Sequence, residues 1–214
     1  MSAAGLPYDG ATVTDHELLQ SWRDGDARAG EALFDRHFRS LHGFFRNKVG
    51  AACQDLVQRV LLACLERRDT FEGKSGFRTW LFGIARFELL RHYREQGKLA
   101  AEGPLPTQSL HDLDPSPSVV IGKAEEERNL SRALRRLPID MQIALELHYW
   151  ERLSTGEIAE VLEIPQGTVK SRLRRGRELL EAEVARLSQT PELAESTVGD
   201  LDRWVGGIRE QLGI

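Results

Sequence analysis

The chain has 214 residues, of which 41% are hydrophobic and 29% are charged, and its formal net charge is −4 at pH 7. This composition is typical of a globular protein with one or two small domains. The apolar runs are too short for membrane insertion, and residues 1–10 lack the pattern of a secretory signal. We therefore expect a cytoplasmic protein in which Cys53 and Cys64 are buried thiols, neither bridged to each other nor redox-active.

Helical spacing dominates the chain, and no convincing alternating strand pattern appears. We expect an all-α fold: two small helical domains joined by a flexible linker, a helix-turn-helix in the second domain, and a C-terminal amphipathic helix. The predicted segments are residues 14–97 and 123–187 for the domains, 98–122 for the linker and 188–214 for the C-terminal extension. The linker contains four prolines and few apolar residues, and its length permits the two domains to be held apart and moved independently.

The first domain is expected to contain four helices. Thr14 and Glu17 have the spacing of a capping box that opens the first helix, and a turn follows at residues 24–26. Gly50 separates the second helix from the third, and residues 73–76 form the loop before the fourth. The apolar stripes of the last three helices comprise Leu33, Phe34, Phe38, Leu41 and Phe45; Leu56, Val57, Val60, Leu61, Cys64 and Leu65; and Phe77, Trp80, Leu81, Ile84 and Leu90.

The second domain has the pattern of a helix-turn-helix. Ser154 and Glu157 form a second capping box, Pro165 marks a tight turn, and a basic helix follows. The start of such a helix can reach base edges in the major groove, and arginines further along can bind phosphates. The predicted DNA contacts are Gln166, Thr168, Lys170, Ser171, Arg172, Arg174 and Arg175.

Beyond this domain, the apolar positions of the C-terminal extension fall on one helical face. They are Val198, Leu201, Trp204, Val205, Ile208 and Leu212. Two interpretations stay open. The helix either packs against the second domain, or its excess of acids masks a DNA- or polymerase-binding surface.

Two independent sets of motifs point to one family. The first set comprises residues 134–138, 157–160, 167–173 and 175–177, and the second set comprises residues 55–58 and 77–86. The first set resembles region four of the extracytoplasmic-function (ECF) sigma factors, which reads the upstream promoter element. The second set resembles the polymerase-binding and promoter-melting helices of region two of that family. The resemblance runs from about residue 15 to residue 186, and it implies promoter-specific transcription initiation with core RNA polymerase, promoter DNA and no cofactor.

The resemblance also implies contacts in the first domain. A protein that melts a duplex needs apolar surface for extruded bases and cations for the single strand, and residues 71–94 interleave aromatic and basic residues. The predicted contacts to the melted element are Lys74, Ser75, Arg78, Arg86, Phe87 and Arg91, whereas Trp80 is assigned to the core. The predicted polymerase contacts are Gln54, Asp55 and Gln58. Residues 52–55 carry one acid where the family often has a cluster, so electrostatic steering should be weaker.

Two kinds of regulator are considered: an anti-sigma factor and a Ser/Thr protein kinase. Thr70 follows Arg67 and Arg68 at a spacing that basophilic kinases favour. A phosphate there would add about −1.5 to −2 charge near the polymerase-binding helix. The alternative is that Thr70 only caps a loop beside two solvated arginines.

Two other functions are weighed. An ordinary helix-turn-helix regulator would bind duplex DNA without polymerase, but the aromatic and basic character of residues 71–94 argues against it. An enzyme is disfavoured because the six histidines are scattered without metal-ligand spacing, and no glycine-rich phosphate loop is present.

Overall fold

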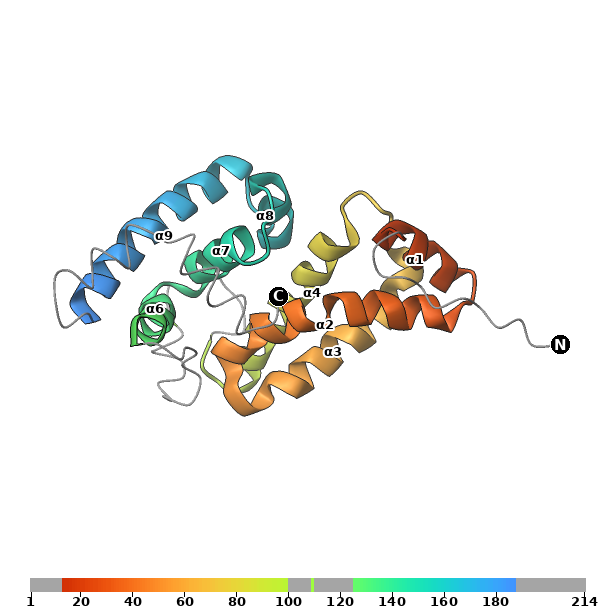
Figure 1. Ribbon diagram of the computed structural model, residues 1–214, viewed down its shortest axis with the longest axis horizontal. Coiled ribbons are helices and arrows are strands. Elements are labelled where there is room, and N and C mark those ends of the chain that lie inside the picture. The colour runs from red at the N-terminus through yellow and green to blue at the C-terminus, as the bar shows by residue number, and fades with distance from the viewer. Residues whose placement is uncertain (1–12, 100–108, 110–124, 188–214) are drawn as a thin grey trace.

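The computed structural model describes residues 13–99, 109 and 125–187, and these form two groups of helices. The first domain consists of α1 (Asp15–Arg23), α2 (Ala27–Val49), α3 (Cys53–Arg67) and α4 (Phe77–Glu95), with short 3-10 turns η1 (Gly50–Ala52) and η2 (Arg68–Thr70). The second consists of α6 (Glu125–Arg136), α7 (Ile139–Tyr149), α8 (Thr155–Leu162) and α9 (Gln166–Leu187) (Figure 1). Apart from an isolated bridge between Ser109 and Pro138, the regular elements of these residues are helical, which confirms the all-α prediction.

Local sequence signals set the ends of the first helices. The Thr14 hydroxyl accepts a hydrogen bond from the Glu17 amide, while the Glu17 carboxylate accepts one from the Thr14 amide at 2.7 Å, as the capping box predicts. Gly50 ends α2 with φ 53°, a conformation that favours glycine. Gly30 is required for a different reason: a Cβ there would lie 2.6 Å from Nε1 of Trp22, so α1 and α2 could not pack this closely.

The predicted apolar stripes form most of the core of the first domain, in which α3 packs against both α2 and α4. Phe38 and Leu65 are exceptions, since both are exposed. Each lies at the edge of its stripe, and a four-helix domain leaves part of each helix circumference uncovered. Cys53 and Cys64 are buried free thiols, as predicted.

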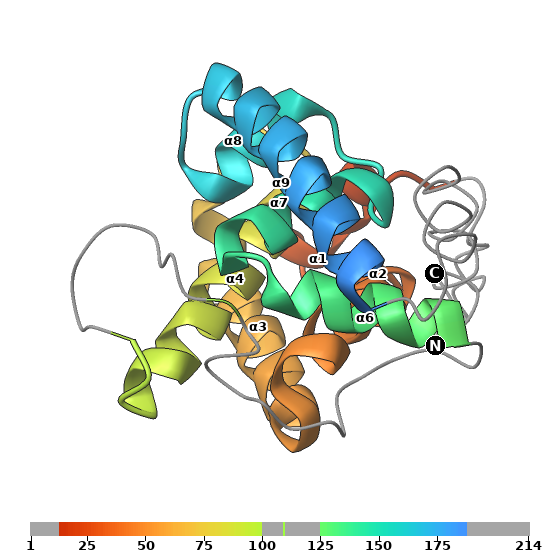
Figure 2. The same ribbon diagram turned by 90° about the vertical axis from the view of Figure 1, so that its left-hand side faces the viewer.

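The two domains contact each other, an arrangement that the sequence pattern does not indicate. Figure 2 shows the second domain seated over α2 and α4, and α8 packs against α4. A buried polar network joins the domains: Lys48 donates to Glu146, the Asn47 amide donates to the same carboxylate at 2.7 Å, and Arg135 donates to the Asn47 carbonyl at 2.6 Å. The length of residues 98–122 permits this arrangement as readily as separated domains.

Two of the predicted segments lie largely outside the described residues. These are the linker, residues 98–122, and the C-terminal extension with its amphipathic helix, residues 188–214. Within the described parts of the chain, no helix is long and apolar enough to cross a membrane.

Candidate nucleic-acid interface

The helix-turn-helix is built from α8, a short turn and α9. The Ser154 hydroxyl donates to Glu157 at 2.7 Å and accepts from its amide, so α8 begins with the predicted capping box. The Ser154 hydrogen bonds lower the pKa of Glu157 below its ordinary value. Glu163 ends α8 in the left-handed region with φ 55°, which turns the chain sharply into α9.

Apolar side chains fix the angle between these helices. Ile158 and Leu162 of α8 and Val169 and Leu173 of α9 are all buried and belong to the hydrophobic core. Gly176 lets α9 approach α7, because a Cβ there would lie 3.2 Å from Cδ1 of Leu145. The exposed face of α9 is therefore held on a rigid three-helix support.

Most of the predicted contacts for the upstream element are exposed on α9. Gln166, Lys170, Ser171, Arg174 and Arg175 are exposed, and Thr168 is half-buried. Arg174 pairs with Glu178 at 2.6 Å and Arg175 pairs with it at 3.3 Å, and both pairs are surface contacts that DNA phosphates can replace.

Arg172 is the exception on this helix. Its side chain is only 18% exposed, and Nη2 lies 3.2 Å from Asp140 on α7. Unlike most of the other predicted contacts on α9, Arg172 is not presented to solvent in this arrangement, because an acid from a neighbouring helix holds the guanidinium against the protein.

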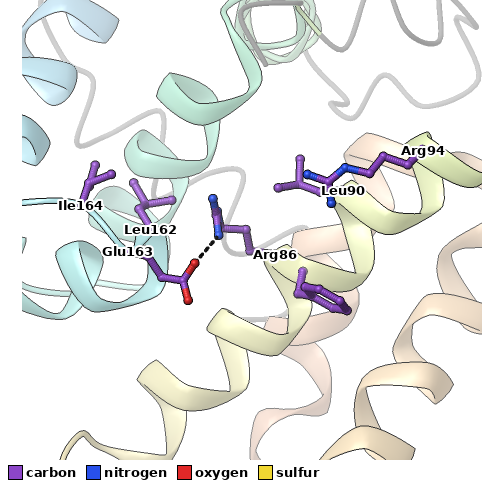
Figure 3. Close-up of a pocket in the computed structure, with 7 residues that line it drawn as sticks. Arg86, Leu90, Arg94, Leu162, Glu163 and Ile164 are labelled. Carbon is purple, nitrogen blue, oxygen red and sulfur yellow. Dashed lines mark ion pairs between the residues drawn. The ribbon is translucent and has the colours of Figure 1, made fainter. Parts of the chain in front are cut away.

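The predicted contacts for the melted element fall into two groups. Lys74 lies in the loop before α4 and is exposed, as are Phe87 and Arg91 on the helix, and Ser75 is half-buried. Arg78 and Arg86 instead face the second domain. Arg78 pairs with Glu151, and Arg86 lies 3.7 Å from the carboxylate of Glu163 (Figure 3). Binding of a melted strand by these two arginines therefore requires the domains to separate.

The aromatic residues of α4 are mainly structural. Phe77, Phe82 and Tyr93 are buried, and the Tyr93 hydroxyl donates to the Lys48 carbonyl at 2.6 Å. Half-buried Trp80 stacks on Phe71 with ring centroids 4.7 Å apart and packs on the core, as assigned. Phe87 is thus the one exposed aromatic residue between positions 71 and 94, because a small helical domain needs its large rings for its own core, whereas Lys74 and Arg91 stay exposed.

The predicted polymerase contacts form one exposed face of α3. Gln54, Asp55 and Gln58 are exposed, while Leu56 and Val60 are buried, as predicted. Asp55 pairs with Arg59 at 3.0 Å. The same face continues through Leu62 and Leu65, which are also exposed. Sequence reasoning missed this apolar extension because it counted helical apolar positions as core.

The buried network between the domains was also missed. Lys48 is 0% exposed and is covered by the Phe44 ring, with Nζ 4.1 Å from its centroid. Burial lowers the pKa of Lys48, and the charge of Glu146 opposes that shift. One sequence signal was available: Lys48 continues the apolar stripe of Leu41 and Phe45 at helical spacing, where a cation needs a partner from elsewhere.

Comparison with known proteins identifies the family of the chain. The model of sigma-70 region 2 matches residues 33–99, and the model of sigma-70 region 4 matches residues 127–180. The ECF RNA polymerase sigma-E factor of Escherichia coli is 30% identical over 187 residues, covering 80% of this chain and 95% of the relative. The chain belongs to the ECF sigma factors of the sigma-70 family. The sigma-E factor of Haemophilus influenzae is similarly related, with 29% identity over 182 residues and 96% of its length covered.

Solved structures share the fold of this sigma factor. CnrH in complex with the cytosolic domain of CnrY is 20% identical with a TM-score of 0.58, covering 81% of this chain and 99% of CnrH. RpoE of Bartonella quintana, in complex with the anti-sigma factor NepR, is 24% identical with a TM-score of 0.51, covering 68% of this chain and 88% of RpoE. These likenesses confirm the two-domain helical fold. As an ECF sigma factor, the protein is an initiation factor of RNA polymerase, and no cluster of metal-ligating side chains occurs among its described residues.

Proposed function

We propose that this sigma factor divides its work between its two domains, acting in the cytoplasm as a subunit with no catalytic role. Residues 14–97 bind core polymerase through Gln54, Asp55 and Gln58 and hold the melted strand near Lys74, Ser75, Phe87 and Arg91, with Arg78 and Arg86 joining once the domains separate. Residues 123–187 bind the upstream promoter element through α9. The observation that carries this proposal is the placement of a region 2 match and a region 4 match on separate helical groups with distinct exposed polar faces.

Capture of core polymerase tests the role of α3. Asp55→Lys should lower the amount of polymerase captured severalfold while leaving far-UV circular dichroism unchanged, because reversing an exposed charge costs little stability. Glu31→Lys is the matched control, since Glu31 is an exposed acid on α2 outside the proposed face. Equal capture by both variants would remove Asp55 from the polymerase-binding surface.

An anti-sigma factor is a further proposed partner. The support is limited to fold: the described helices match two sigma factors that were solved as complexes with a second protein. Co-purification from the native host of a small protein that blocks polymerase capture would identify it.

We also propose Thr70 as a phosphorylation site for a Ser/Thr kinase. Thr70 is exposed in η2, directly after the polymerase-binding helix, and its hydroxyl donates to the Arg67 carbonyl at 2.9 Å. Phosphorylation would supply acidic charge that residues 52–55 lack. Thr70→Ala should then lower transcription in a strain that retains its kinases, and Thr70→Glu should preserve it. Full activity of Thr70→Ala, with no phosphate on Thr70 by mass spectrometry, would reject the site.

A further inference from the structure

A cavity of about 300 Å³ lies between the two domains, where α4 faces the turn of the helix-turn-helix. Its α4 wall consists of Arg86, Phe87, Leu90 and Arg94. Its opposite wall consists of Leu162, Glu163 and Ile164. Figure 3 shows Arg86 and Arg94 extending from the same helix, with Leu90 between them along the chain.

The positive charge in this pocket is incompletely neutralised. The Arg86 side chain is only 11% exposed, and its one ion pair with another described residue is the 3.7 Å contact with Glu163, whose side chain is 84% exposed. Arg94 has no ion pair among the described residues, and its Nε is buried without a hydrogen-bond partner. Burial lowers the pKa of Arg86, with Arg172 and Arg94 adding repulsion and Glu163 and Asp140 opposing it. A buried donor without an acceptor is unfavourable, so an anion that accepts from Arg94 would be stabilised at this site.

We propose that this pocket binds the phosphate group of a small phosphorylated molecule and that the bound molecule holds the two domains together. Guanidinium groups bind phosphate oxygens through strong charge-assisted hydrogen bonds, and two of them match the several oxygens of one phosphate. Leu90, Leu162 and Ile164 offer an apolar wall to the organic part, and exposed Phe87 offers a ring on which a planar group can stack. The volume accommodates a ligand of this size.

This inference adds a regulatory ligand to the proposed function and does not depend on polymerase. The pocket takes its walls from both domains, so a molecule bound there favours the closed arrangement. It also occupies Arg86, which we assign to the melted strand. Ligand and promoter should therefore compete, with high ligand concentrations lowering initiation.

Calorimetric titration of the full chain tests the site directly. The probes are inorganic phosphate, adenosine 5′-monophosphate and a short single-stranded oligonucleotide, each at an ionic strength matched with potassium chloride. We expect the mononucleotide to bind more tightly than phosphate and to raise the melting temperature.

Three variants, each with a different expected effect, test whether the mononucleotide binds in this pocket. Arg94→Gln should weaken binding of the mononucleotide about tenfold, because it removes a charge-assisted contact. Glu163→Gln should strengthen binding, because it releases Arg86 from its acid. Arg39→Gln, at an exposed arginine of α2 outside the pocket, should leave binding unchanged.

Several results would overturn the proposal. They are absence of binding by phosphate and the mononucleotide, equal binding by wild type and Arg94→Gln, or weaker binding by Glu163→Gln. Binding of the oligonucleotide alone would assign the arginines to a DNA strand instead. These titrations contain no polymerase or promoter, so their failure leaves the proposed function intact.

Discussion

Lys170 and Arg172 lie two positions apart on α9 but in different surroundings. Lys170 is exposed, whereas Arg172 is held by Asp140. Lys170→Ala should weaken promoter binding by the holoenzyme and reduce the slope of its salt dependence by about one, as expected for one lost phosphate contact. Arg172→Ala should also weaken promoter binding. Fluorescence anisotropy with promoter DNA over a salt series measures both effects, and normal affinity in both variants would exclude this helix from recognition.

The two cysteines should be unreactive in the folded protein. Burial raises the pKa of Cys64 to about 12 and also raises the pKa of Cys53. At pH 8, about one Cys64 thiol in ten thousand is ionised, so its reaction with a disulfide reagent should be negligible until the protein unfolds. Titration with such a reagent should detect no thiol in native protein and both thiols in denaturant. Rapid native labelling of Cys64 would contradict the packing of α3.

Residue positions could be predicted from sequence where one helix determines them. The apolar stripe placed Leu56 inside and the family resemblance placed Asp55 and Gln58 on the surface, and the structure agrees with both. The environment of Arg172 could not be predicted in this way, because Asp140 lies on a different helix and 32 positions earlier in the sequence.

At the scale of elements, the two capping boxes allow each domain to be perturbed separately. Ser154→Ala should destabilise the second domain by about 1 kcal/mol, because α8 loses its N-cap. Thr14→Ala makes the same change at α1 in the first domain. Hydrogen exchange of α8 and α9 amides should increase in the first variant and stay unchanged in the second. Equal effects of both variants on α8 would show that the capping boxes do not act locally.

The capping box of Ser154 and Glu157 makes the stability of the second domain depend on pH. The folded-state pKa of Glu157 lies below its ordinary value, so its contribution is present above about pH 4.5 and is lost as pH falls through the folded-state value. Glu157→Gln removes this charge. Its stability should therefore fall less than that of wild type between pH 5 and about pH 3. If the stability of the two proteins fell equally with decreasing pH, the Glu157 carboxylate would not be the source of this pH dependence.

Element types were more predictable than element surfaces. Periodicity, caps and turn residues predicted the four helices of the first domain and the two helices of the helix-turn-helix, because these signals act within a few residues. The surface of α4 was predicted less well. That helix is buried around much of its circumference, and its sequence does not distinguish a ring that packs inside from one that faces DNA.

For the whole molecule, the buried pair of Lys48 and Glu146 should control whether the domains stay together. Glu146→Lys places two cations in one buried site, and separation lets both be hydrated. The radius of gyration from small-angle scattering should rise while helical content stays constant. The double exchange, Lys48→Glu with Glu146→Lys, should restore compactness. A loss of helical content without a rise in the radius of gyration would mean that the variant disrupts the fold and does not separate the two domains.

The docking of the domains was the part of the fold that sequence could not predict. It depends on pairs such as Arg78 with Glu151 and Arg86 with Glu163, whose partners lie more than seventy positions apart. In its own stretch of sequence, each of these four residues has the pattern of an ordinary surface charge. A linker compatible with both open and closed arrangements adds no restriction.

Reconstituted transcription with purified sigma factor and core polymerase, on a promoter mapped in the native host, tests the proposed function most directly. A specific transcript should appear only when both proteins are present. Its amount should decrease strongly with Asp55→Lys or Lys170→Ala, and a scrambled upstream element should give little transcript. Tight, sequence-specific binding to duplex DNA by the sigma factor alone, with no transcript when polymerase is added, would contradict the proposed function.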